Sequence, residues 1–203
     1  MFRFLVFIGA LGAGYFIYQQ FLAKQGEFDE NGNAKTVLYV INNCPPCDDA
    51  VRFLKARKID FELLDALGNG KERAANYRQA SYPMLVIGDS VQKGYSRAEF
   101  TAELGKSYGL ASLPRSDQRV FSYNFNESGS AKVVMYGTKS CGYCKKANQY
   151  FADAGVNYIE YDIESNGAAS RRFKQLDGSG TPLIYIGFDR INGFNERKLN
   201  ELL

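Results

Sequence analysis

The segment from Lys132 to Cys144 constrains the fold of this chain more than any other feature. It reads Lys-Val-Val-Met-Tyr-Gly-Thr-Lys-Ser-Cys-Gly-Tyr-Cys. The apolar, β-branched run in its first half predicts a buried strand, and a short polar turn then leads into a segment that predicts a helix. Cys141 and Cys144 therefore lie where a helix begins. The N–H groups and the dipole of a helix N-terminus favour an anionic sulfur, so the pattern predicts a thiolate that attacks disulfides, with a second cysteine to resolve the product.

A second copy of this pattern lies earlier in the chain. A predicted strand begins at Thr36, and Cys44 and Cys47 follow it with the same spacing. Cys44 and Cys141 are 97 positions apart, as are Tyr39 and Tyr136. Two further pairs of segments match at an offset of 99, namely Ser81–Pro83 with Gly180–Pro182 and Gly94–Ser96 with Gly193–Asn195. The sequence therefore contains an internal duplication.

At these residues each half resembles the glutaredoxins, the small glutathione-linked branch of the thioredoxin-like fold. Three landmarks carry the resemblance in order: a strand before a Cys-x-x-Cys pair, a proline before the third strand, and a glycine turn before the last helix. The resemblance covers most of the 203 residues. It implies an α/β fold class, with two thioredoxin-like domains of glutaredoxin-type βαβαββα order in tandem. The apolar sequence before them independently predicts one N-terminal transmembrane helix.

The first 24 residues differ from everything that follows them. Residues 4–23 carry no charged side chain, and about 20 apolar residues suit one crossing of a bilayer. We expect a transmembrane anchor at residues 1–24, with a cleaved signal peptide or a buried soluble helix as alternatives. Arg3 and the amino group oppose Lys24, so the positive-inside rule places the N-terminus in the cytoplasm and the domains outside it, by a margin of about one charge.

The remaining chain predicts two domains. We expect a polar tether at residues 25–35, a first domain at 36–108, a linker at 109–131 and a second domain at 132–203. Predicted strands lie at 36–41, 60–64, 84–87 and about 91, then at 132–136, 157–161, 183–186 and 190–191; predicted helices lie at 47–58, 71–79, 97–107, 144–154, 168–176 and 196–203. Within the linker, residues 119–125 alternate and suggest an additional edge strand. Apolar residues expected in the second core are Val156, Tyr158, Ile159, Phe173, Leu176, Leu183 and Ile184.

Composition excludes several classes of function. A net charge of +3 without a block of like charges predicts no nucleic-acid partner. The chain contains no histidine, which excludes Ser-His-Asp and Cys-His catalysis and any histidine-ligated metal. All four cysteines belong to the two Cys-x-x-Cys pairs, a usage typical of redox or metal chemistry rather than of a disulfide scaffold.

The two cysteine pairs have different neighbours. Lys139, Lys145 and Lys146 surround the second pair, whereas Asp48 and Asp49 follow the first. Positive charge favours a thiolate and negative charge disfavours it, so we expect a lower thiolate pKa at Cys141 than at Cys44. Pro45 and Pro46 also remove two N–H donors, whereas Gly142 and Tyr143 keep theirs. The aspartates and prolines are equally ordinary at a helix start.

The resemblance to glutaredoxins implies further site residues. Pro83 and Pro182 match the family's cis-proline, beside which Tyr82 and Thr181 are expected to pair with the backbone of glutathione or of the substrate. The glycine turn is matched by Gly193, Phe194 and Asn195, where the family holds the γ-glutamyl end of glutathione; Asn195 replaces the usual aspartate and is equally suited to be a helix N-cap. Lys139 matches the basic residue expected before the active cysteine, and Tyr143 lies between the cysteines.

The sequence therefore predicts a membrane-anchored glutaredoxin-type thiol–disulfide oxidoreductase. Cys141 is the expected nucleophile and Cys144 the resolving cysteine, and Cys44 and Cys47 repeat these roles. No bound cofactor is expected; glutathione is a possible co-substrate, and disulfide-containing proteins and the membrane are the expected partners. Binding of a soft metal or an iron–sulfur cluster by the cysteines is one alternative. A redox-inactive docking role for the first domain is another.

Overall fold

The computed structural model describes residues 26–78 and 80–203. The chain divides after Gly94 into two compact units. The predicted anchor at residues 1–24 lies outside the described residues. Over the described ranges, no helix is long and apolar enough to cross a membrane.

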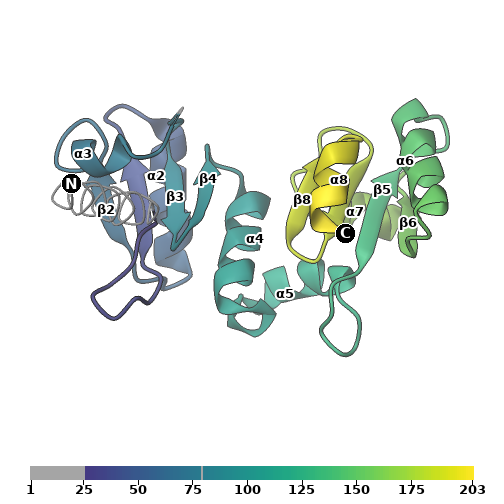
Figure 1. Ribbon diagram of the computed structural model, residues 1–203, viewed down its shortest axis with the longest axis horizontal. Coiled ribbons are helices and arrows are strands. Elements are labelled where there is room, and N and C mark those ends of the chain that lie inside the picture. Colours follow the sequence, from purple (N-terminus) through teal and green to yellow (C-terminus); the bar gives the residue numbers. More distant parts are fainter. Residues whose placement is uncertain (1–25, 79) are drawn as a thin grey trace, which may run out of the picture. The chain divides into compact units, whose positions relative to one another are not determined.

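The first unit contains a four-stranded mixed sheet (Figure 1). Its strands are β1 (Thr36–Val40), β2 (Glu62–Asp65), β3 (Met84–Ile87) and β4 (Ser90–Lys93), in the order β2-β1-β3-β4. β1 is parallel to β2 and antiparallel to β3, which in turn is antiparallel to β4. The helices of this unit within its described residues, 26–78 and 80–94, are α2 (Pro45–Ala56) and α3 (Lys71–Ala74).

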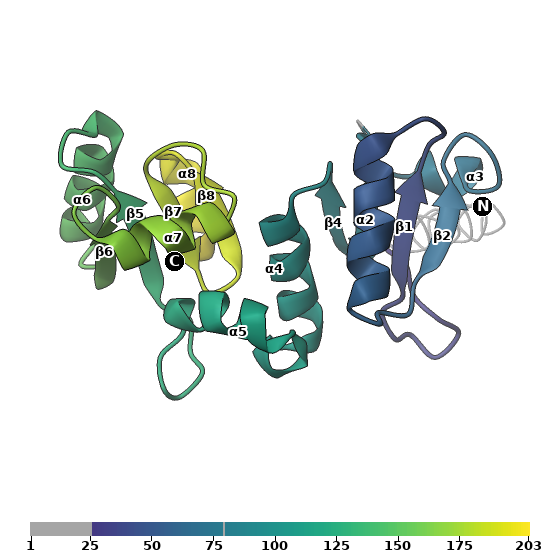
Figure 2. The ribbon, with the colours of Figure 1, turned by 180° about the vertical axis from the view of Figure 1, so that it is seen from behind.

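Alternating side chains of β1 and β3 serve the two faces of this sheet. On one face, Val37 and Tyr39 pack with Ala74 of α3 and with Tyr77 just beyond it. Leu38 and Leu85 are fully buried on the opposite face, where α2 lies (Figure 2). The strand that leads to Cys44 is thus buried from both sides.

The described part of the predicted polar tether, residues 26–35, is folded onto the first unit. Glu27 pairs with Gly88 and Phe28 with Ala34 as isolated β-bridges, and only 7% of Glu27 is exposed. The second unit repeats this feature, because Phe125 pairs with Ala131. The two hairpin-like loops lie at the same offset of 97 as the cysteines, so the duplication begins before the first strand of each half.

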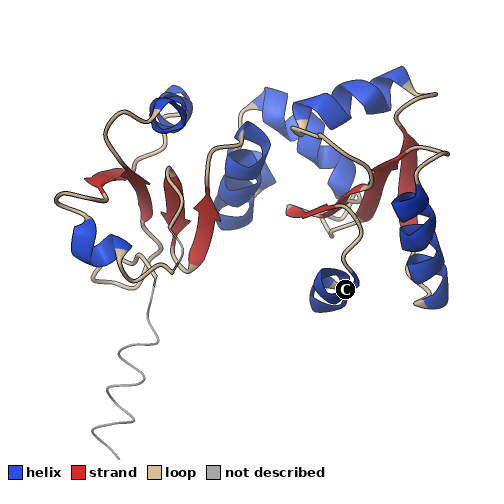
Figure 3. Ribbon diagram, turned by 90° about the horizontal axis from the view of Figure 1, so that it is seen from above, coloured by secondary structure: helices blue, strands red, loops and turns tan. Residues whose placement is uncertain are grey.

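The second unit contains a sheet of the same topology, in the order β6-β5-β7-β8. Its elements are α4 (Arg97–Tyr108), η1 (Leu110–Ser112), α5 (Arg115–Phe121), η2 (Ser122–Asn124), β5 (Val133–Gly137), α6 (Gly142–Asp153), β6 (Tyr158–Asp162), α7 (Gly167–Gln175), β7 (Leu183–Ile186), β8 (Asp189–Asn192) and α8 (Glu196–Leu202). Helices lie on both faces of each sheet (Figure 3). One face of the second sheet packs against α4, α5 and α7, and the other against α6 and α8.

The predicted order βαβαββα is confirmed in both halves, and β3 and β7 have the predicted limits. The predicted extra strand at residues 119–125 is wrong, because α5 and η2 occupy these positions and bury Phe121. Ile159 was expected in the core but is 38% exposed, since β6 is an edge strand. The other six predicted core residues are buried or half-buried.

Helix α4 belongs to the second unit, although the sequence analysis places it at the end of the first domain. Ala102 joins the apolar cluster of the second sheet, and a side chain on Gly105 would clash with the ring of Phe188. Lys106 forms a salt bridge with Asp189 at 2.7 Å. These contacts tie α4 to the turn between β7 and β8.

Candidate active site

Cys141 caps the N-terminus of α6. Its backbone is extended, and its Sγ accepts a hydrogen bond from the N–H of Cys144 at 3.0 Å. The helix begins at Gly142, earlier than predicted, so the sulfur lies where the helix N–H groups converge. Cys141 and Cys144 form a disulfide with Cα atoms 5.2 Å apart. Cys141 is half-buried, whereas Cys144 is only 1% exposed.

Cys44 has the same position at the start of α2. Its Sγ accepts a hydrogen bond from the N–H of Cys47 at 3.2 Å, and the two cysteines form a disulfide. Pro45 and Pro46 do not remove this donor, because Cys47 is the first residue after them that carries an N–H. The two sites therefore have the same N–H donor nearest to the sulfur, and the prolines do not cause the expected difference at this donor.

The charged neighbours are partly paired. Asp49 forms an ion pair with Arg52, and the ammonium group of Lys146 lies 5.2 Å from the centre of the Tyr143 ring. Hydrogen bonds from the Ser165 side chain and the Glu164 backbone, together with the positive charge of Lys139, hold the pKa of Asp162 below its ordinary value. The second site therefore still has more positive charge near its cysteines than the first, but these interactions reduce the difference.

The peptide bonds before Pro83 and Pro182 are both cis, as predicted. In each half the carbonyl of this proline accepts a hydrogen bond from the glycine turn, Pro83 from Gly94 and Pro182 from Gly193, both at 2.8 Å. The structure thus brings the predicted proline and glycine elements together. Thr181 and Tyr82 are half-buried beside their prolines.

The remaining predicted site residues of the second half are Phe194, Asn195, Lys139 and Tyr143, which lie near the N-termini of α6 and α8. Phe194 packs on the apolar cluster that includes Cys141, with its ring 6.0 Å from that of Tyr150. Asn195 caps α8 and accepts a hydrogen bond from the N–H of Lys198 at 3.0 Å. Lys139 is exposed and Tyr143 is 61% exposed. Tyr143 thus offers an accessible aromatic surface between the two cysteines.

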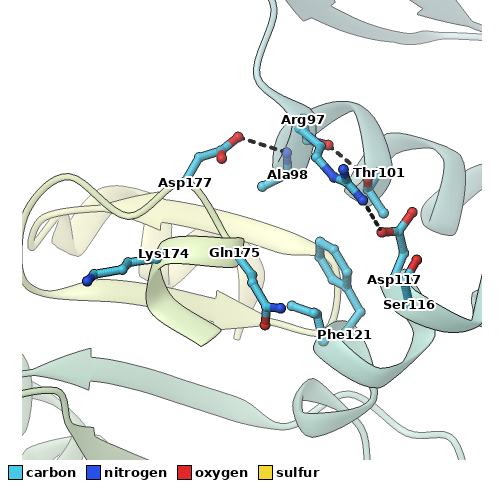
Figure 4. A pocket seen from close by; sticks show the side chains of 10 residues that line it. Arg97, Ala98, Thr101, Ser116, Asp117, Phe121, Lys174, Gln175 and Asp177 are labelled. Atoms are coloured by element: carbon cyan, nitrogen blue, oxygen red, sulfur yellow. Dashed lines mark hydrogen bonds and ion pairs between the residues drawn. The ribbon is translucent and has the colours of Figure 1, made fainter. Parts of the chain in front are cut away.

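The N-terminus of α4, the counterpart of α8 in the duplication, is closed by a carboxylate. Asp177 accepts a hydrogen bond from the Ala98 N–H at 3.0 Å (Figure 4). It also accepts one from the Ser96 hydroxyl at 2.7 Å. Asp177 is not among the predicted site residues, because it is distant in the chain from α4. In the sequence, Asp177 is marked only by its position in a Gly-rich turn. In the structure its backbone is left-handed, with a φ of 51°.

A cavity of about 300 Å³ lies beside this contact, between α4, α5 and α7. One of its charged groups, Arg97, forms an ion pair with Asp117 at 3.0 Å. Its lining includes none of the predicted site residues. In the described part of the chain, no three His, Cys, Asp or Glu side chains form a group that could hold a metal ion.

Comparison with known proteins identifies the same regions. The glutaredoxin family profile matches residues 36–91 and 133–191, so it covers both cysteine pairs and more than half of the chain. A glutaredoxin-like 8.6 kDa protein of a rubredoxin operon in Clostridium pasteurianum is 25% identical over 72 residues, which are 35% of this chain and 96% of that protein.

Two solved structures show the same kind of similarity. The thioredoxin-like protein BC3987 is 29% identical, with a TM-score of 0.34, over 36% of this chain and 100% of that one. A glutaredoxin from Archaeoglobus fulgidus is 28% identical, with a TM-score of 0.33, over 37% of this chain and 88% of that one.

Proposed function

Because this chain belongs to the glutaredoxin family, we propose that it is a thiol–disulfide oxidoreductase acting through its two Cys-x-x-Cys pairs. One observation carries the proposal: the Sγ of Cys141 lies at the N-terminus of α6 and accepts a hydrogen bond from the backbone. This position favours a thiolate once the pair is reduced.

In the reducing direction, the Cys141 thiolate attacks one sulfur of a substrate disulfide and the other sulfur leaves as a thiolate. A mixed disulfide now joins Cys141 to the substrate. Cys144 loses its proton and attacks Cys141 Sγ, which forms the intramolecular disulfide and releases the second substrate thiolate. The substrate gains two electrons, and the cysteine pair loses two. Two external thiols, such as glutathione, then reduce the pair again.

The substrates that we propose are mixed disulfides of proteins or of glutathione. Thr181, next to cis-Pro182, is the proposed partner of the substrate backbone, and Lys139 and the turn of Gly193, Phe194 and Asn195 are the proposed contacts for glutathione. The glycine turn of the first half leads into α4, and the carboxylate of Asp177 already binds the N-terminus of this helix. We therefore assign glutathione-dependent activity to the second half, and assign Cys44 and Cys47 a relay or docking role.

We further propose that residues 4–23 anchor the protein in a membrane, with both domains outside the cytoplasm. The support is the uncharged sequence of this segment and its length. The substrates in that compartment would be exported proteins, and a partner protein would supply the electrons wherever glutathione is scarce.

The test is a glutathione-coupled disulfide reduction assay on the full chain, in which glutathione reductase and NADPH report turnover. One variant carries Cys141→Ser and Cys144→Ser, and its matched control carries Cys44→Ser and Cys47→Ser. We expect the first variant to lose all activity and the control to keep most of it. Equal activity in both variants would contradict the assignment to the second half. An inactive parent protein would contradict the use of glutathione.

A further inference from the structure

The resolving step sets a problem for Cys144, given the proposed function on which this inference rests. Cys144 must lose a proton before it attacks Cys141, yet it is only 1% exposed. Burial in apolar surroundings disfavours a thiolate. A nearby group that accepts the proton would remove this barrier.

Glu160 lies close enough to reach Cys144 through one intermediate atom. A Cβ atom on Gly137 would lie 3.1 Å from the Sγ of Cys144 and 3.2 Å from the Oε1 of Glu160. The two side chains therefore border the same point, and their Sγ and Oε1 atoms lie no further apart than the sum of these two distances. A gap of this size between a carboxylate and a thiol is suited to a bridging water molecule.

The glycine at position 137 is not required by the backbone. Gly137 ends β5, and it is absent from the residues with positive φ. Glycine weakens a strand, and inside one it often marks a place where another group approaches closely. Here the group that approaches is the pair of Cys144 and Glu160, so the missing side chain keeps the path between them open.

Asn148 fixes the carboxylate and supplies a second polar atom. Its Nδ2 donates a hydrogen bond to the Oε2 of Glu160 at 3.0 Å, which leaves Oε1 directed toward Gly137. The Oδ1 of Asn148 is buried and has no hydrogen-bond partner within the described residues. Buried acceptors of this kind are usually paired with protein or water, so this atom is suited to accept a hydrogen bond from a water beside Glu160.

The first half of the chain carries none of these groups. At the offset of 97, Gly137 corresponds to Val40, Asn148 to Val51 and Glu160 to Leu63. The strand registers agree, because Leu63 pairs with Leu38 as Glu160 pairs with Met135. Three apolar residues at the matching positions of the first half thus correspond to a glycine, an amide and a carboxylate in the second half. This coordinated difference indicates a function specific to the second site.

We propose that Glu160 accepts the proton of Cys144, through a water molecule beside Gly137, as Cys144 attacks the mixed disulfide. The Cys144 S–H bond breaks and the proton passes through the water to Glu160. The new S–S bond forms between Cys144 and Cys141, and the substrate sulfur leaves with the electron pair of the broken disulfide. Glu160 then releases the proton to solvent. In the opposite direction, protonated Glu160 returns the proton to Cys144 when a thiol opens the disulfide.

The test separates attack from resolution in the full chain with Cys44→Ser and Cys47→Ser. The reduced protein is mixed in a stopped-flow instrument with one equivalent of 5,5′-dithiobis(2-nitrobenzoate). Attack by Cys141 releases a first thionitrobenzoate, and attack by Cys144 on the resulting mixed disulfide releases a second. The second phase is intramolecular, so its rate does not depend on the reagent concentration.

The decisive variant is Glu160→Gln, with Glu164→Gln as the control that removes the same charge four residues away. At pH 7 we expect Glu160→Gln to slow the second phase by at least about tenfold, because a general base typically contributes about 10² to 10⁴-fold. The first phase should change less than twofold. Gly137→Ala should also slow the second phase, although it keeps the carboxylate. Glu164→Gln should change neither phase.

The pH profile excludes a merely structural role for Glu160. Without the carboxylate, the second phase should depend on free thiolate, rise about tenfold per pH unit, and approach the parent rate only above the ordinary thiol pKa of about 8.5, because burial disfavours the Cys144 thiolate. The other titratable groups nearby are Lys145 on α6, Tyr158 and Asp162 on β6, and Lys139 before Cys141. Burial and the Glu160 charge raise the pKa of Tyr158, so this phenol stays neutral over that range.

The outcomes of this experiment distinguish the inference from the proposed function. If the second phase of Glu160→Gln keeps the parent rate at every pH, or becomes faster, the role of Glu160 is refuted while thiol–disulfide exchange stands. If the parent shows no first phase beyond that of a Cys141→Ser variant, the proposed function itself fails. The first half gives an internal comparison: with Cys141→Ser and Cys144→Ser, resolution by Cys47 should already show the steep pH dependence.

Discussion

Single side chains give the two cysteine pairs different chemistry on the same backbone. Both nucleophile positions are helix N-caps whose sulfur accepts one N–H hydrogen bond. Lys145 and Lys146 follow Cys144, whereas Asp48 and Asp49 follow Cys47. Because the backbone donors are alike, the charge of these neighbours decides how strongly each thiolate is stabilised.

We expect the thiolate pKa of Cys141 to lie about one unit below that of Cys44. Charges near a helix start contribute about 0.3 to 1 kcal/mol each, and about 1.4 kcal/mol corresponds to one unit. The measurement is the pH dependence of iodoacetamide alkylation in chains that keep only one of these two cysteines. Asp48→Asn should lower the pKa of Cys44, and Lys145→Gln should raise that of Cys141. Equal values in all these chains would show that the charges have no effect.

At the scale of elements, the sequence predicts the strands and helices well but not the partners of α4. The alternation of Val37, Leu38 and Tyr39, and the repeat at an offset of 97, are local signals that specify the sheet and the cysteine positions. The contacts of α4 depend on Asp177 and Phe188, which lie some 80 residues further along the chain and carry no pattern of their own. Long-range packing of this kind leaves no signal in periodicity.

The same reason explains which site residues the sequence reveals. The cysteines, prolines and glycine turns follow from the duplication, because both copies keep them. Glu160 differs between the copies, and its relevance depends on Gly137 and Asn148 lying beside it in space. The replacement of Val40, Val51 and Leu63 by polar residues or glycine was visible in the sequence, but only the structure shows that these three positions meet.

The contact of Asp177 with α4 has a measurable effect on stability. We expect Asp177→Asn to lower the free energy of unfolding by about 0.5 to 1 kcal/mol, because it removes a negative charge from a helix N-terminus and weakens two hydrogen bonds. Asparagine tolerates the left-handed backbone of this residue, so the variant tests the charge rather than the turn. Urea unfolding is the measurement, with Asp153→Asn at the C-terminal end of α6 as the control. A larger loss in the control would contradict the assignment.

At the scale of the whole molecule, the two units differ in the charged residue that contacts their matching tyrosines, Tyr39 in the first unit and Tyr136 in the second. In the first unit, Glu27 accepts hydrogen bonds from Tyr39, Tyr77 and Arg73, and Arg73 also pairs with Glu62 at 2.7 Å. In the second, Arg172 lies 3.6 Å from the ring centre of Tyr123 and donates to the Tyr136 hydroxyl at 3.3 Å. Asn124 replaces Glu27 at the offset of 97 and donates to the Gly187 carbonyl. Among the described residues beneath these matching tyrosines, an ionised carboxylate is therefore present in the first unit, and an arginine takes its place in the second.

This difference predicts that the first unit loses stability in acid before the second. Burial raises the pKa of Glu27, but hydrogen bonds from Arg73, Tyr39 and Tyr77 outweigh it and hold the pKa below its ordinary value. Hydrogen bonds from Arg73 and Lys35 lower the pKa of Glu62 to about 2. A carboxylate with a lowered folded-state pKa stabilises the fold above its unfolded pKa of about 4.3, and this stability is lost as the pH falls toward 2.

Differential scanning calorimetry of the full chain between pH 7 and pH 2.5 tests this expectation. The transition of the first unit should move to lower temperature as the pH falls below about 4.5, whereas that of the second should move less. Glu27→Gln identifies the first transition, because loss of charged hydrogen bonds at this buried site should cost about 1.5 to 3 kcal/mol at pH 7. The same variant should also flatten the acid dependence of that transition. If Glu27→Gln leaves both transitions and their pH dependence unchanged, the carboxylate network does not stabilise the first unit.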